Sequence, residues 1–146
     1  MLKLLSLACL AIVVVLFAAS CGPQPVSLAD VPVYPGATPM GLGQNEMVDE
    51  LAGIIERSSG SEGVNVEVEL YALPQNTAWD ALKSYYDGEL ASSDWELEQD
   101  LGNESDVFST RGWGRGSGSN EQALVVGYIA DPVIGDAFLI LGLYTE

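Results

Sequence analysis

The sequence contains no histidine, only two cysteines and only five basic residues among 146. Without histidine, no Ser-His-Asp or Cys-His catalytic arrangement can form, and no metal site can use imidazole ligands. Cys9 lies inside an apolar N-terminal run, so removal of that run would leave Cys21 alone, with no partner for an internal disulfide. These absences exclude most hydrolase templates.

Positive charge is scarce, and the net charge is −16 because 21 acidic residues oppose the five basic ones. Removal of Lys3, the one charged residue among residues 1–20, would make it −17. Such a chain repels nucleic-acid phosphates and anionic lipid headgroups, which bind clustered Lys and Arg. We therefore expect no nucleic-acid partner. The apolar content is too high for a disordered acidic chain, so the charge favours a soluble folded surface.

Residues 1–20 have the layout of a secretory signal peptide. Lys3 supplies the positive start, Leu4 to Ala19 is almost uninterruptedly apolar, and small residues follow. The run is shorter than the roughly 20 apolar residues that span a bilayer comfortably, and no positive charge follows it as in a stop-transfer anchor. Cleavage is therefore the favoured interpretation, with an uncleaved anchor and ordinary secretion as alternatives.

The segment Ala18-Ala19-Ser20-Cys21 resembles the bacterial lipobox, departing from the commonest pattern in having Ala18 where leucine is usual. The resemblance covers the first 21 residues. It implies that Cys21 receives a diacylglycerol thioether before cleavage and that acyl chains such as palmitate anchor the protein outside the cytoplasm. Stable anchoring needs two or more such chains. Gly22 follows the cysteine, which in a host with two membranes would imply the outer membrane.

Residues 21–30 contain two prolines and few apolar residues, which is typical of a tether. Residues 31–146 are then one domain's worth of chain. Apolar spacing predicts a main helix over 77–92, with Thr77 as a candidate cap, and a second helix over 45–57 also fits the pattern. Extended structure is predicted at 31–37, 65–72, 95–98, 106–113, 122–129 and 137–144. In the cleanest strand, 65–72, alternation predicts one buried and one solvated face.

This order of elements predicts an α+β fold, a mostly antiparallel sheet of about five strands covered by the main helix.

A second resemblance supports this fold. Val31 to Ala37, Leu82 to Tyr86, Leu90 and Trp95 are similar to a pattern in uncharacterised bacterial envelope proteins. The departures are Ser93-Asp94 where that pattern has a glycine, and a longer insertion between Ala37 and Val64. The resemblance implies the fold and the compartment only, because that group has no function to carry over.

Four features of the sequence could form sites, and each also has a structural interpretation. Glu67 and Glu69 could form a carboxylate pair, but a strand face needs them only for solvation. Residues 98–106 offer oxygen ligands for Ca²⁺, yet their spacing does not match an EF-hand and a hairpin connection explains them. Residues 112–118 are glycine-rich but do not open a helix as a phosphate loop does. If exposed there, Trp113 and Arg115 could form a mobile contact surface.

The fourth feature is an aromatic stripe that could line a ligand pocket but is explained more simply as core. Its members are Trp79, Tyr85, Tyr86 and Trp95, with Tyr85 expected off the buried stripe.

We therefore expect no catalytic, cofactor or metal residue and a single modification site, Cys21. The predicted protein is a non-enzymatic, lipid-anchored accessory or scaffolding module with an envelope protein as partner. The alternatives are a small-ligand or Ca²⁺-binding envelope protein and a carboxylate-based enzyme.

Overall fold

The computed structural model describes residues 23–58 and 63–146, which fold around one six-stranded antiparallel sheet. Cys21 lies outside the described residues. The strands follow one another in the sheet in the order β1-β2-β6-β5-β4-β3. Their bounds are β1 Thr38–Met40, β2 Asn65–Ala72, β3 Glu96–Asn103, β4 Phe108–Arg115, β5 Gln122–Ala130 and β6 Ala137–Thr145. Helices α2 (Glu46–Ser58) and α3 (Trp79–Leu90) and the short 3-10 helices η1 (Leu28–Asp30) and η2 (Gly118–Asn120) complete the fold, confirming the predicted α+β class with one strand more than expected.

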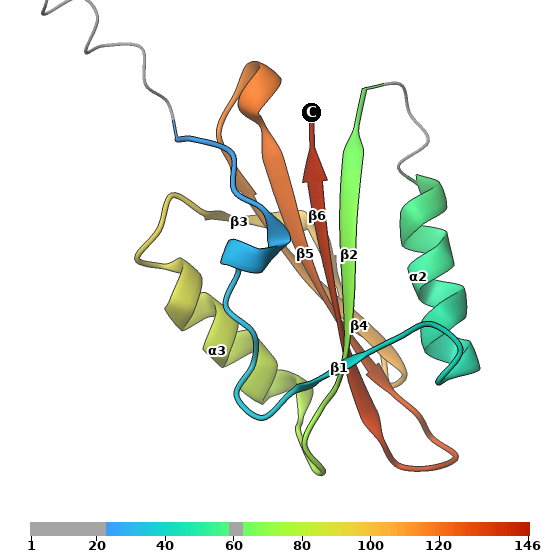
Figure 1. Cartoon of the computed structure of the whole chain (residues 1–146). Coiled ribbons are helices and arrows are strands. Elements are labelled where there is room, and N and C mark those ends of the chain that lie inside the picture. Colours follow the sequence, from blue (N-terminus) through green and yellow to red (C-terminus); the bar gives the residue numbers. More distant parts are fainter. Residues whose placement is uncertain (1–22, 59–62) are drawn as a thin grey trace, which may run out of the picture.

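The two helices cover opposite faces of the sheet (Figure 1). Alternate residues of β6 belong to the two resulting cores: Leu139, Leu141 and Leu143 pack with α3, whereas Phe138 and Ile140 pack with α2. Successive side chains of a strand point to opposite faces, so a central strand buried on both faces must be apolar throughout. The half-covered sheet expected from the sequence is therefore replaced by a sheet covered on both sides.

The N-terminal segment, residues 26–31, also packs into the core on the α3 side. Leu28 and Val31 are buried, and Val26 packs against the same cluster. The predicted tether over 21–30 thus differs from the structure, in which the chain docks from Val26 onward. Residues 31–37 are not a strand: they end in a turn at Pro35 and Gly36, and the first strand begins at Thr38. Isolated apolar residues between prolines gave no periodic signal for this packing.

Both predicted helices are present, but α3 begins differently from the expectation. Its N-cap is Ala78, with no side-chain cap. Thr77 instead donates its hydroxyl to the Pro74 carbonyl at 2.7 Å, while its own carbonyl accepts the Tyr128 hydroxyl at 3.1 Å. Asn45 caps α2 by accepting the Val48 amide at 3.1 Å. Within residues 23–58 and 63–146, no helix is long and apolar enough to cross a membrane.

Strand β3 forms one edge of the sheet and is exposed along its whole length. Its register with β4 shifts between Glu98 and Asn103, which marks a bulge. The bulge brings Leu101 over Gly112, where a Cβ would lie only 2.4 Å from the Cβ of Leu101. A glycine is therefore required at position 112 by this close approach.

Candidate functional site

The two glutamates of β2 contact the N-terminal half of the domain rather than solvent alone. Glu67 accepts the Leu28 amide at 3.0 Å, and Glu69 accepts the Tyr71 hydroxyl. Both glutamates are half-buried and Tyr71 is buried, so the strand face predicted to be solvated is in fact covered. Burial, and then the hydrogen bond to Glu69, raise the pKa of Tyr71 to about 12. These contacts give both carboxylates a structural role.

The aromatic stripe packs as core. Tyr86 and Trp95 are buried, whereas Trp79 and Tyr85 are half-buried against the same cluster. Tyr85 contacts Tyr86 edge-on, with ring centroids 5.1 Å apart, and donates its hydroxyl to the Val33 carbonyl at 2.9 Å. Burial raises the pKa of Tyr86 far above its ordinary range. Tyr85 thus joins α3 to Val33, just after the N-terminal segment.

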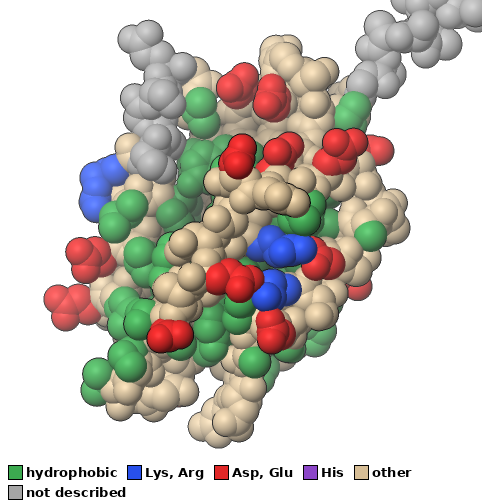
Figure 2. Space-filling view, turned by 180° about the vertical axis from the view of Figure 1, so that it is seen from behind, with side chains coloured by type: hydrophobic (Ala, Val, Ile, Leu, Met, Phe, Trp, Pro, Cys, Tyr) green, Lys and Arg blue, Asp and Glu red, His purple; other side chains and the backbone are tan. Residues whose placement is uncertain are grey.

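The acidic segment 98–106 is divided between β3 and the turn that follows it. Glu98 lies in the strand, whereas Glu104 accepts the Lys83 ammonium at 2.8 Å and the Trp79 indole at 3.1 Å. These two hydrogen bonds, first that from Lys83, lower the pKa of Glu104. Among the described residues, no three acidic or cysteine side chains gather as a metal site would require. Figure 2 shows basic side chains on this face set among acidic ones.

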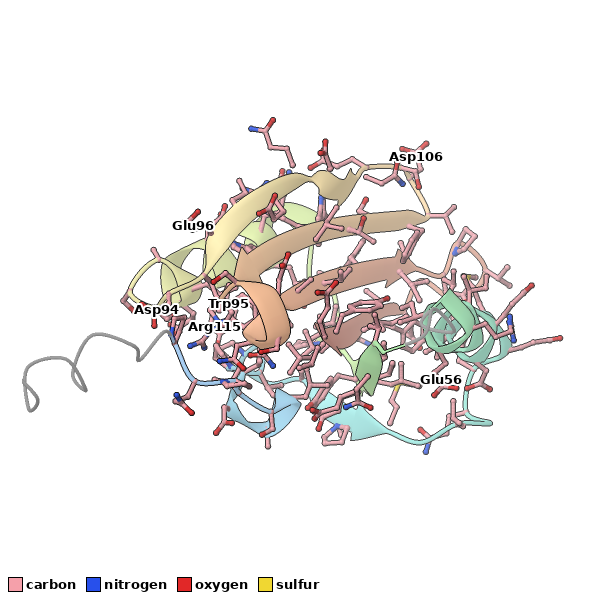
Figure 3. The ribbon with its side chains drawn as sticks, turned by 90° about the horizontal axis from the view of Figure 1, so that it is seen from above. Glu56, Asp94, Trp95, Glu96, Asp106 and Arg115 are labelled. Carbon is pink, nitrogen blue, oxygen red and sulfur yellow. The ribbon has the colours of Figure 1, made fainter. Side chains whose placement is uncertain are left out.

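The glycine-rich segment lies largely within β4. Trp113 is buried, so it is not part of a contact surface. Arg115 lies over the ring of Trp95, 5.3 Å from its centroid, and pairs with Asp94 at 3.6 Å. Its guanidinium also donates to the Gln24 carbonyl at 3.3 Å. Figure 3 shows Trp95 and Arg115 together, beside a polar cleft of about 530 Å³ that Pro23 also lines.

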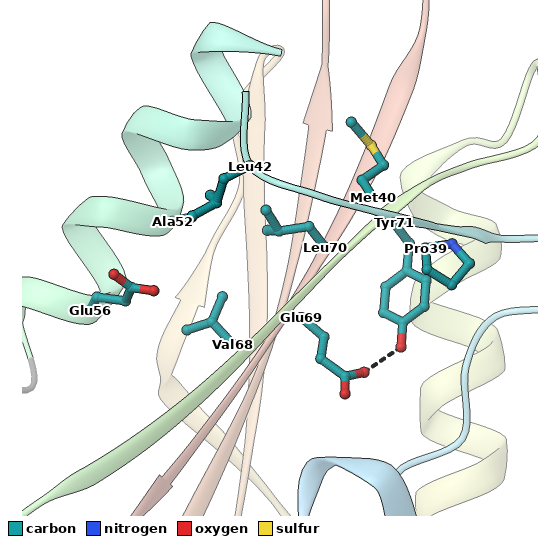
Figure 4. Close-up of a pocket in the computed structure, with 9 residues that line it drawn as sticks. All are labelled: Pro39, Met40, Leu42, Ala52, Glu56, Val68, Glu69, Leu70 and Tyr71. Carbon is teal, nitrogen blue, oxygen red and sulfur yellow. Dashed lines mark hydrogen bonds between the residues drawn. The ribbon is translucent and has the colours of Figure 1, made fainter. Parts of the chain in front are cut away.

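A groove of about 390 Å³ with both apolar and acidic lining, here called the α2 groove, lies between α2, β1 and β2. Its lining includes Met40, Leu42, Ala52, Val68 and Leu70, with Glu56 at the helix. Figure 4 shows Val68 and Leu70 turned toward α2, while Glu69 and Tyr71 lie on the other side of β2. The groove lies on the face of the sheet opposite to Trp79, Tyr85 and Trp95, beside which the small-ligand alternative would place its pocket.

The turn between β5 and β6 exposes two large apolar side chains. Val133 is 88% exposed and Ile134 is 59% exposed. From the sequence, Asp131-Pro132 indicates only a turn between two strands. The signal that could have identified it is a pair of β-branched residues at positions where turns are usually polar. We call Val133 and Ile134 the hairpin tip.

Comparison of the chain with protein-family models, with characterised proteins and with solved structures gave no match.

Proposed function

We propose that this protein is an extracytoplasmic lipoprotein, anchored by acyl chains on Cys21, that acts without catalysis as a contact module of an envelope assembly. The sequence supports the anchor through the apolar run from Leu4 to Ala19 that ends at the lipobox-like residues before Cys21. The lack of histidine supports a non-enzymatic role. The partners would be membrane lipid and an envelope protein.

The observation that carries the contact role is the rigid docking of the N-terminal segment. Val26 is hydrogen-bonded through both its amide and its carbonyl to the side chain of Gln122, at the start of β5. Five residue steps separate Cys21 from Val26, so an extended chain holds them at most about 18 Å apart. A lipid on Cys21 would therefore keep this end of the sheet close to the bilayer surface.

The length of β5 then sets the distance of the opposite end from the membrane. This strand runs from Gln122 to Ala130, and eight residue steps of a strand span about 27 Å. The turn that follows it lies at the opposite end of the sheet from the point where the N-terminal segment enters (Figure 1). An anchored domain would thus present the hairpin tip away from the lipid, where a second protein can reach it.

Detergent-phase partitioning tests the anchor. The full chain is expected in the detergent phase, the Cys21→Ser variant is expected as unprocessed precursor, and Cys9→Ser serves as the matched control because Cys9 lies within the removed segment. A Cys21→Ser variant that still yields the same mature, detergent-partitioning species would refute the lipid anchor.

The second candidate, a small-ligand-binding envelope protein, is favoured by one observation, the α2 groove. A ligand bound in this groove should raise the melting temperature of the folded chain. The effect should disappear in Leu42→Asp, which places a charge in the lining at a position that is 68% exposed. A melting temperature that does not respond to apolar probes or to Ca²⁺ would oppose this candidate.

A further inference from the structure

The hairpin tip is held by hydrogen bonds within its own turn. Oδ1 of Asp131 accepts the amides of Val133 and Ile134 at 2.8 and 3.2 Å. The Asp131 amide donates to the Asp136 carbonyl at 2.8 Å, and Gly135, whose φ is +76°, donates its amide to the Asp131 carbonyl at 2.9 Å. These bonds use no side-chain atom of Val133 or Ile134. The turn therefore does not need large apolar side chains at these two positions.

Two adjacent, preorganised apolar side chains are suited to binding. Burying a Val or Ile side chain is favourable, and a rigid turn loses little conformational entropy when it binds. In Figure 2, hydrophobic side chains are exposed at the lower left, the end that holds this hairpin. The hairpin tip thus has the properties of a binding anchor.

A groove of about 400 Å³ lies directly beside the hairpin tip, between the turn and the first turns of α2. Met47 and Val133 supply its apolar lining, and three carboxylates, Glu46, Glu50 and Asp131, supply its negative charge. The amides of Val133 and Ile134 lower the pKa of Asp131 below its ordinary value. We call this the tip groove. Lys and Arg match it, because their aliphatic stems cover apolar surface while their charged ends reach carboxylates.

The negative charge of the tip groove decides which kind of molecule can bind there. A second copy of this chain would bring another 16 negative charges to an already acidic surface. An anionic lipid surface is opposed by the same carboxylates. A protein segment that carries positive charge beside apolar side chains is complementary to both parts of this surface.

We propose that the hairpin tip and the tip groove together bind a protein partner that presents a Lys or Arg beside an apolar side chain. The proposal specifies the partner of the contact module proposed above and rests on that function.

A displayed library of random dodecapeptides, selected against the full chain held in lipid nanodiscs, tests this chemistry. The expected peptides combine Lys or Arg with a neighbouring large apolar residue and shift the methyl NMR signals of Val133 and Ile134. The double variant Val133→Ser/Ile134→Ser should weaken their binding by about tenfold or more. The matched control is Leu97→Ser/Ile54→Ser, which alters two side chains exposed to 44% and 48% elsewhere and should bind as the unmodified chain does.

A second pair of variants separates this surface from general acidity. Glu46→Gln/Glu50→Gln should weaken peptide binding, whereas Glu96→Gln/Glu98→Gln, with the same change of charge on β3, should not. Four results would overturn the proposal: no enriched peptide, enriched peptides without basic residues, binding that survives Val133→Ser/Ile134→Ser, or equal losses in both glutamine pairs.

The other occupants are also outcomes of this experiment. Broadening of the Ile134 methyl signal by spin-labelled lipid would place the hairpin tip in the bilayer and overturn the proposal. Self-association of the detergent-solubilised chain that is lost in Val133→Ser/Ile134→Ser would assign the surface to a second copy and do the same. Failure of the anchor is recognised separately, since Cys21→Ser should abolish processing and lipid attachment and leave peptide binding intact.

Discussion

The side-chain amide of Gln122 pairs with both polar groups of Val26, a residue 96 positions away. Gln122 Oε1 accepts the Val26 amide at 2.9 Å, and its Nε2 donates to the Val26 carbonyl at 2.8 Å. The same Nε2 donates to the Thr145 hydroxyl at 3.0 Å, and Gln122 is itself only 2% exposed. One buried amide therefore holds the N-terminal segment against the start of β5 and the end of β6.

Gln122→Ala should lower the free energy of unfolding by about 2–3 kcal/mol, because it leaves the Val26 amide and carbonyl without partners in a partly buried position. Urea unfolding of the full chain measures the change. Asn120→Ala, at an exposed neighbouring position, is the control and should change stability by less than about 0.5 kcal/mol. Equal stabilities for the two variants would show that the N-terminal segment is not held by Gln122.

Gly112→Ala should destabilise the fold by about 1–3 kcal/mol, because the new Cβ would lie 2.4 Å from the Cβ of Leu101. Leu101→Ala keeps that Cβ but removes the leucine branch, whose Cδ1 would lie 2.7 Å from the new methyl group. The double variant should therefore recover only part of the loss, which a double-mutant cycle of unfolding free energies measures.

Gly88→Ala is the control for that experiment, because a Cβ at position 88 meets nothing within 4 Å and the residue lies inside α3. Alanine there should stabilise the helix by about 0.5–1 kcal/mol. If Gly112→Ala instead stabilised the protein to the same extent, the close approach of β3 to β4 would be contradicted.

Tyr71 should make the fold sensitive to alkali. Its pKa is raised to about 12 in the folded protein from an ordinary value of 10.0, so the folded state holds the phenolic proton more tightly than the unfolded state. This contribution to stability is complete below pH 10 and is lost as the pH rises through about 12. Unfolding curves of the full chain and of Tyr71→Phe across this range should show a shallower alkaline decline for the variant.

The comparison near about pH 8, where phenols are protonated in both states, gives the baseline for Tyr71→Phe. The difference in stability between the two proteins should shrink as the pH rises from that baseline. A constant difference across the alkaline range would mean that the Tyr71 hydroxyl titrates alike in the folded and unfolded chain.

Much of the fold could be predicted from periodicity. The helical spacing of Leu82, Tyr86 and Leu90 predicted α3 correctly, and alternation in residues 65–72 predicted β2. The cover on the second face was missed because the glutamates of β2 were assigned to solvent. Tyr71 on that same face, and the unbroken apolar run of β6, were the signals that both faces are buried.

The candidate surface could be predicted less well, because it depends on side chains brought together from distant segments. Val133 and Glu46 line one groove although 87 positions separate them, and no local pattern reports that distance. Trp113 shows the converse case. Its glycine neighbours suggested a flexible, exposed loop, whereas in the structure they flank a buried ring within strand β4.

Intact-mass spectrometry of the full chain extracted from membranes tests the central claim most directly. The account predicts a chain that begins at Cys21 and carries the added mass of a diacylglycerol thioether with its acyl chains. It also predicts that Cys21→Ser accumulates with residues 1–20 still attached, whereas Cys9→Ser is processed normally. A mature chain with an unmodified Cys21, or an unchanged mass in Cys21→Ser, would contradict the lipid anchor.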